Sequence, residues 1–180
     1  VKRVAYVEQT MYEGTHCTNN VFAQRRYINI MRPEAVRAFL RVTHDEYARR
    51  FPEQMGSLIW AAFTDEPSLM AFYLSGEEHA PVIPWRPDLP KVFQTRKRYD
   101  LVQHLPALFG EETAKAAQVR CDFWELVSDI CADSYFAQIE RWCATRGLLS
   151  SGHLLLEENL WGHIVSEGHA LKCLKQMALP

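Results

Sequence analysis

Two stretches of this chain pair an apolar run with terminal acidic side chains. The first, LIWAAFTDEP from Leu58 to Pro67, places six apolar residues ahead of Asp65 and Glu66. Six residues are too few for a helix core, and a run without polar alternation is typical of a strand buried on both faces of a parallel sheet. Proline has no N–H to donate, so Pro67 ends the strand. The pattern predicts two carboxylates at the carboxyl end of a parallel strand; a surface turn after a core strand has the same pattern.

The second stretch, LLSSGHLLLEE from Leu148 to Glu158, repeats this arrangement. The small residues from Ser150 to Gly152 permit close packing or the close approach of a ligand. His153 adds a polar ring, and Glu157 and Glu158 end the run. A second parallel strand is therefore expected, and it also delivers carboxylates.

Apolar positions three and four residues apart predict the helices. A helix opens at Arg32-Pro33-Glu34, since proline suits the first helical position, and it ends before Pro52. Residues 112–146 predict a longer helix of about 50 Å, for which we expect a kink or a split. Shorter helices are expected over residues 99–109 and 171–177, a loop or short turn over residues 159–168, and a strand over residues 1–7. Residues 178–180 are expected to lead into a further strand that this chain does not contain.

The connection over residues 67–98 holds five of the nine prolines and shows no periodicity. A loop of this length is uncommon unless it is functional, and this one follows directly from a strand that ends in carboxylates. Within it, Trp85 and Arg86 offer an aromatic ring and a guanidinium, which suit stacking on a sugar and hydrogen bonding to its hydroxyls. The alternative is a tryptophan that only packs the loop down.

Composition and charge narrow the classes of partner. The chain has 180 residues, 48% of them hydrophobic, which is enough for one domain with a sizeable core. With 20 basic and 22 acidic residues, the net charge of -2 argues against a nucleic-acid or membrane partner. No apolar run approaches the length of a transmembrane helix. A neutral partner such as a carbohydrate fits this surface.

Five cysteines occur without a C-x-x-C pair, which argues against a disulfide framework and a zinc ribbon. Reduced, mostly buried thiols are the simplest interpretation, and they favour a cytoplasmic compartment, with a periplasmic or secreted one left open. The five are Cys17, Cys121, Cys131, Cys143 and Cys173.

The two stretches suggest acid–base chemistry by carboxylates. If their strands are neighbours, about 4.8 Å apart, Glu66 and Glu157 can form the pair that glycoside hydrolysis needs. Glu66 would be the proton donor, and Asp65 would orient its neighbours. This chemistry requires no cofactor; a calcium ion in a structural or site role is left open.

Two other functions remain open. His153 and Glu157, with His169 or Asp65, could ligate a divalent ion, although no H-E-x-x-H spacing is present. The second alternative is a non-catalytic module, either carbohydrate-binding or structural, that uses the loop around Trp85.

A set of motifs in order resembles one enzyme family. FTDEP at residues 63–67, PW at 84–85, YDL at 99–101, LPALF at 105–109, VRCDFW at 119–124 and SGHLLLEE at 151–158 are similar to the TIM-barrel catalytic region of bacterial α-L-rhamnosidase-type glycoside hydrolases, glycoside hydrolase family 106 and its relatives. The resemblance covers roughly residues 29–180. It implies an α/β fold, a partial (β/α)8 TIM barrel with parallel strands and helical crossovers, and an enzyme that acts on plant-type glycans.

The resemblance implies that Glu66 is a catalytic carboxylate at a strand end and that Gly152, His153 and Glu157 lie at the rim of the active site. Together with the interpretation of the residues themselves, it makes Glu66 and Glu157 the expected catalytic residues. The expected substrate-binding residues are Asp65, Trp85, Arg86, Asp122, His153 and Glu158. A solvated helical face explains Asp122 equally well. Because a barrel takes about 250 residues, residues 1–180 are expected to be a single partial catalytic domain of a longer multidomain protein. The remainder of the barrel and accessory β domains would lie outside this chain, and the second catalytic carboxylate could lie beyond Pro180.

Overall fold

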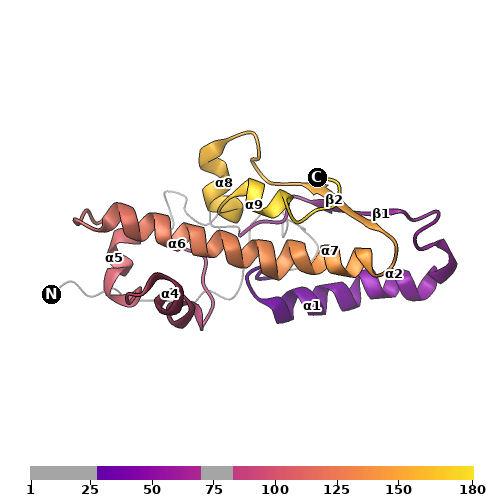
Figure 1. Cartoon of the computed structure of the whole chain (residues 1–180), viewed down its shortest axis with the longest axis horizontal. Coiled ribbons are helices and arrows are strands. Elements are labelled where there is room, and N and C mark those ends of the chain that lie inside the picture. Colours follow the sequence, from indigo (N-terminus) through magenta and orange to yellow (C-terminus); the bar gives the residue numbers. More distant parts are fainter. Residues whose placement is uncertain (1–27, 70–82) are drawn as a thin grey trace, which may run out of the picture. The chain divides into compact units, whose positions relative to one another are not determined.

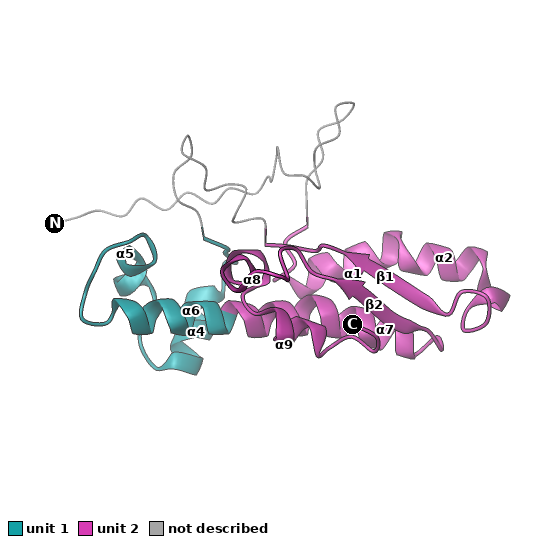
Figure 2. Ribbon diagram, turned by 90° about the horizontal axis from the view of Figure 1, so that it is seen from above, with its two compact units in different colours: residues 1–27, 70–126 teal, residues 28–69, 127–180 magenta. Residues whose placement is uncertain are grey.

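The computed structural model describes residues 28–69 and 83–180, which belong to two compact units. Unit 1 comprises residues 1–27 and 70–126, and unit 2 comprises residues 28–69 and 127–180 (Figure 2). The expected strand over residues 1–7 lies outside the described residues, as do Cys17 and the part of the proline-rich loop from residue 70 to residue 82.

Unit 1 is helical in its described residues. The 3-10 helix η2 and the helix α5 replace the single short helix expected over residues 99–109, and α6 begins in this unit and ends in unit 2. Its elements are α4 (Leu89–Lys97), η2 (Val102–His104), α5 (Leu105–Leu108) and α6 (Ala116–Cys131).

Unit 2 combines helices with a small parallel sheet, and α1 and α7 run side by side in it (Figure 1). Its helices are α1 (Pro33–Val42), α2 (His44–Arg50), the 3-10 helix η1 (Pro52–Gln54), the π-helical segment η3 (Ala132–Phe136), α7 (Ala137–Ala144), α8 (Leu160–Glu167) and α9 (Ala170–Leu174). Its strands are β1 (Ala61–Asp65) and β2 (Leu149–His153).

The helix α1 starts where the sequence predicts. Pro33 occupies its first turn after Arg32, and Val36 and Leu40 are buried on one face. The Thr43 hydroxyl donates a 2.7 Å hydrogen bond to the carbonyl of Phe39, and α2 begins at the next residue. One predicted helix is therefore two, because the backbone at Thr43, with a φ of -111° and a ψ of -75°, departs from regular helical geometry.

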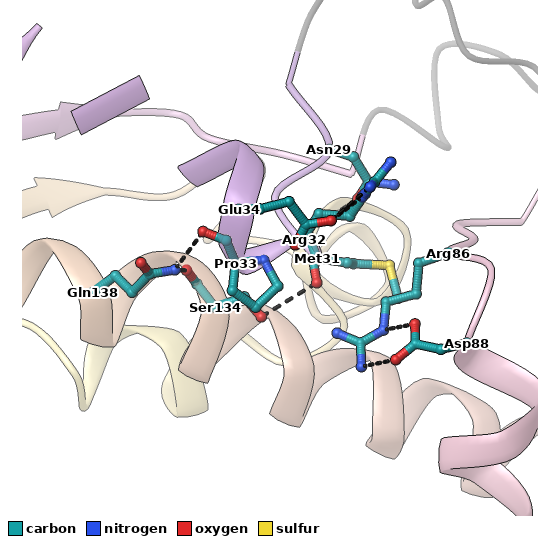
Figure 3. A network of polar contacts seen from close by, with 9 residues as sticks. All are labelled: Asn29, Met31, Arg32, Pro33, Glu34, Arg86, Asp88, Ser134 and Gln138. Atoms are coloured by element: carbon teal, nitrogen blue, oxygen red, sulfur yellow. Dashed lines mark hydrogen bonds and ion pairs between the residues drawn. The ribbon is translucent and has the colours of Figure 1, made fainter. Parts of the chain in front are cut away.

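The long predicted helix is interrupted as expected. Between α6 and α7 the five residues of η3 adopt π-helical geometry. The buried Ser134 hydroxyl donates to the carbonyl of Met31 at 3.2 Å, and the Gln138 amide donates to the carbonyl of Pro33 at 3.2 Å (Figure 3). These bonds hold the start of α1 against η3 and α7.

The helix α2 is tied to α7 by a second set of polar contacts. The Trp142 indole donates a 2.7 Å hydrogen bond to Asp45, and the Arg146 guanidinium lies 3.2 Å from the same carboxylate. The guanidinium also lies 4.1 Å above the Trp142 ring, a cation–π arrangement. These contacts fix the end of α7 from which the chain turns into β2.

The two strands pair in parallel, with Ala61 opposite Leu149 and Asp65 opposite His153. Gly152 lies opposite Thr64 with a φ of 150°, and a Cβ at this position would lie 2.2 Å from the Thr64 carbonyl oxygen. Gly152 was predicted to permit the close approach of another group, and the group that approaches it is the backbone of β1 at Thr64. Leu179 forms an isolated parallel bridge to Ser151 beside the two-stranded sheet.

The predicted fold class is wrong. Within residues 28–69 and 83–180 the structure is mostly helical, and its sheet has two strands instead of the parallel strands of a partial (β/α)8 TIM barrel. The run taken for a strand buried on both faces is not covered: Leu58 is 80% exposed, Trp60 58% and Phe63 67%. The uninterrupted apolar run at residues 58–63 therefore wrongly predicted a strand that is covered on both faces.

The extents of two irregular segments are also wrong. The proline-rich loop expected to continue to residue 98 gives way to α4 at Leu89, because Pro90 falls within the first turn of a helix, where proline is tolerated. The loop expected over residues 159–168 contains α8. The organisation of residues 1–180 as one partial domain of a longer protein stays a prediction.

None of the described helices has the length and apolar character needed to cross a membrane.

The Gly152→Ala substitution should disrupt the pairing of β1 with β2, because the added Cβ collides with backbone atoms that have no room to move. We expect a loss of about 3 kcal/mol or more in the free energy of unfolding, measured by urea denaturation. Gly147→Ala is the matched control: its φ is also positive, at 71°, but the nearest atom to its Cβ lies 3.6 Å away. This control should lose only about 1 kcal/mol, and equal losses in both variants would contradict the close contact at Thr64.

Candidate functional site

The carboxyl ends of β1 and β2 bring an aspartate and a histidine together. Asp65 and His153 are register partners, and the Nε2 atom of His153 lies 2.9 Å from Oδ1 of Asp65. An ionised carboxylate only accepts hydrogen bonds, so the imidazole carries its proton on Nε2 in this contact. The Phe63 ring lies 5.9 Å from the imidazole on the same side of the site. The pair is accessible, because the Asp65 side chain is exposed and that of His153 is partly exposed.

Glu157 faces the other nitrogen of the same imidazole. It lies on the turn after β2, where Oε2 accepts a 2.9 Å hydrogen bond from the amide of Leu154. Its Oε1 atom is 3.9 Å from Nδ1 of His153, which is ion-pair range but too long for a direct hydrogen bond. The His153 ring therefore lies between two carboxylates that come from different strand ends.

Glu66 completes the cluster directly after β1. Its amide donates a 3.3 Å hydrogen bond to the carbonyl of His153, and its φ is 47°, in the left-handed region that non-glycine residues rarely adopt. Possible metal-ligating atoms of Asp65, Glu66 and His153 all lie within 4.8 Å of one another. Two oxygen ligands and one nitrogen ligand can thus act on the same small volume.

Four of the residues proposed from sequence meet at this edge, namely Asp65, Glu66, His153 and Glu157. Glu158 follows on the same turn and is exposed. The assignment of roles to all five stays a prediction.

Trp85, Arg86 and Asp122 belong to unit 1. The Arg86 guanidinium pairs with Asp88, with Nη2 2.9 Å from Oδ2 (Figure 3). Asp122 accepts a 2.9 Å hydrogen bond from the hydroxyl of Tyr99, and burial together with this bond raises the pKa of the tyrosine. The proposed roles of Trp85, Arg86 and Asp122 in substrate binding stay predictions. Arg86 and Asp122 each have a hydrogen-bond partner within unit 1.

A buried acid on α8 escaped the sequence interpretation. Glu167 is 0% exposed, and neither of its carboxyl oxygens has a hydrogen-bond partner within the described structure. Burial, with a smaller effect from the charge of Glu157, raises the pKa of Glu167 to about 9. The signal for its helix was Asn159, whose side chain caps α8 by accepting from the amides of Trp161 and Gly162.

Four of the five cysteines lie within the described residues. Cys131, Cys143 and Cys173 are buried, whereas Cys121 is exposed. Burial raises the pKa of Cys143 to about 11 and also raises that of Cys173, which keeps both thiols protonated and unreactive at neutral pH. The interpretation as reduced, mostly buried thiols is confirmed for these four.

The described residues form a mostly helical protein with a two-stranded parallel sheet. At one end of this sheet lies a carboxylate–imidazole cluster, which consists of Asp65, Glu66, His153 and Glu157. No protein-family model, curated protein or solved structure matches the chain. The resemblance to α-L-rhamnosidase-type enzymes therefore stays a prediction that rests on the sequence motifs.

Glu167 should make the protein less stable as the pH rises. Below its ordinary pKa of 4.5 both the folded and the unfolded protein hold the proton; between pH 4.5 and about 9 only the folded protein does. The free energy of unfolding should fall by at most about 1.4 kcal/mol per pH unit over this range. Glu167→Gln should remove much of this slope in urea denaturation between pH 5 and pH 8. The exposed control Glu53→Gln should keep it, and a Glu167→Gln slope equal to that of the wild type would contradict the assignment.

Proposed function

We propose that this chain carries the acid–base site of a glycoside hydrolase that acts on plant-type glycans, with α-L-rhamnosides as the first substrates to test. The observation that supports the proposal is that the two glutamates named from sequence follow neighbouring parallel strands. Between them, His153 lies against Asp65 and faces Glu157.

The chemistry needs two carboxyl groups with different tasks. Glu66, as the acid, gives its proton to the glycosidic oxygen while the bond from that oxygen to the anomeric carbon breaks. Glu157, as the carboxylate, either removes a proton from the attacking water or attacks the anomeric carbon itself. Asp65 and His153 form a hydrogen-bonded pair beside both groups and would hold the local charge and geometry.

The backbone of Glu66 supports such a role because its amide bonds to the carbonyl of His153. The segment that follows is held as well, since the amide of Leu69 donates a 2.6 Å hydrogen bond to the carbonyl of Ser166 on α8. A left-handed backbone at a non-glycine residue persists only where its surroundings enforce it, and such residues cluster at active sites.

Replacing Glu66 with glutamine should abolish hydrolysis while the protein remains folded. Removing a general acid costs about 100- to 10,000-fold in rate, so kcat/KM for a panel of aryl glycosides that includes an aryl α-L-rhamnoside should fall by at least that much. Glu53→Gln, an exposed glutamate of the same unit, is the matched control and should keep full activity. A Glu66→Gln protein as active as the wild type would sink the proposal.

A second candidate function is metal-assisted hydrolysis, which the grouping of Asp65, Glu66 and His153 favours. Divalent ions bind such ligands at about 2.0 to 2.5 Å, so ligands on opposite sides of an ion lie about 4 to 5 Å apart. The spacing within 4.8 Å is compatible with that geometry. The ion would polarise a bound substrate oxygen or activate a water.

Isothermal titration of the protein with Ca²⁺, Mn²⁺ and Zn²⁺ tests this second candidate. We expect one of these ions to bind at a single site, with affinity lowered at least about 10-fold by Asp65→Asn and by His153→Ala. Asp133→Asn, an exposed aspartate outside the cluster, should leave binding unchanged. Absence of binding, or binding that survives both cluster substitutions, would exclude a metal site at these residues.

A further inference from the structure

We infer that Gly162 and His163 of α8 are positioning residues that hold Glu157 against His153, an inference that rests on the proposed function of Glu157. Neither residue belongs to the carboxylate–imidazole cluster itself. Both contact the turn that carries Glu157, and each does so by a different physical interaction.

The turn that carries Glu157 depends on an unusual backbone conformation. Leu156 has a φ of 58°, in the left-handed region, and its carbonyl accepts a 3.0 Å hydrogen bond from the amide of Asn159. Leucine adopts this conformation only against a steric penalty. Contacts outside the turn must therefore support it.

Gly162 provides the first of these contacts. It is buried inside α8, where a Cβ would lie 2.6 Å from the Cβ of Leu156 and 3.1 Å from its Cδ1. A glycine within a helix destabilises that helix relative to alanine. Its presence here is explained by Leu156, whose side chain occupies the space that any larger residue would need.

His163 provides the second contact. The Nε2 atom of its ring is hydrogen-bonded to the main-chain carbonyl oxygen of Glu157, so this ring carries its proton on Nε2. The carboxylate of the same residue is held by the amide of Leu154 at 2.9 Å. The backbone and the side chain of Glu157 are thus fixed separately, and Oε1 is left facing Nδ1 of His153.

The helix that supplies both contacts is itself anchored to the rest of unit 2. Ser166 accepts the hydrogen bond from Leu69 in the segment after β1. Gly168 packs so closely on α6 that a Cβ there would lie 2.8 Å from the Cβ of Ser128. Since α8 contacts the segments that follow both strands, it can set the position of Glu157 relative to Asp65 and His153.

The test uses Gly162→Ala and His163→Ala in the full chain, with His163→Gln as the conservative variant because its amide can still donate to the carbonyl. Leu160→Ala, at an exposed position of the same helix, is the control. The first readout is the pair of ¹⁵N chemical shifts of the His153 imidazole, recorded with EDTA, and Glu157→Gln gives the reference change. The second is kcat and KM on an aryl glycoside that the wild type hydrolyses.

We expect Gly162→Ala and His163→Ala to move the His153 shifts toward those of Glu157→Gln, and to lower kcat at least 10-fold with KM changed less than 3-fold. His163→Gln should restore most of kcat, and Leu160→Ala should behave as wild type. If Gly162→Ala fails to fold, His163→Ala and His163→Gln decide the question alone.

Unchanged His153 shifts in the folded variants, when Glu157→Gln does move them, would overturn the inference. Failure of the proposed function is distinguishable from this outcome. In that case Glu157→Gln leaves hydrolysis intact or no glycoside is hydrolysed, while the His153 shifts still report whether α8 positions Glu157.

Discussion

The close contact of Gly152 with Thr64 is the constraint on which the candidate site depends. It allows β2 to lie against β1 in the register that pairs Asp65 with His153. A shift of one residue would turn alternate side chains to opposite faces of the sheet and separate the carboxylate from the imidazole. The chemistry proposed for Glu66 and Glu157 thus begins with a backbone contact that only glycine permits.

The surroundings of this sheet determine how firmly the register is held. On one side, α7 is linked to β2 through the hydrogen bond from Ser150 to Glu140. At the strand ends, α8 contacts the segments after both strands, through Leu69 and Leu156. The same helix buries the unpartnered carboxyl of Glu167, which weakens the fold at neutral pH. A stability cost close to the site is common where function and packing compete.

The sequence identified the two parallel strands but neither the end of the second nor their environment. FTDEP was correctly placed at the end of a strand, because an apolar run with terminal acids is a local signal. In SGHLLLEE the strand ends at His153, and the two glutamates lie on the turn that follows instead of at the end of the strand. The exposure of Trp60 and Phe63 could not be read from those signals, since it depends on which elements cover the strand. The pairing of Asp65 with His153 joins residues 88 positions apart and required a register that no local pattern contains. The helix α8 was missed because Gly162 and Gly168 resemble loop residues, although Asn159 marked its start.

The register of β1 and β2 is the central claim, and cross-strand nuclear Overhauser effects in the isotopically labelled full chain test it most directly. The account predicts contacts from the amide proton of Leu149 to the α-protons of Trp60 and Ala61. It also predicts contacts from the amide proton of Glu66 to the α-protons of His153 and Leu154, as the hydrogen bonds to the Trp60 and His153 carbonyls require. A set shifted by one residue, or an antiparallel set, would contradict the pairing that forms the site.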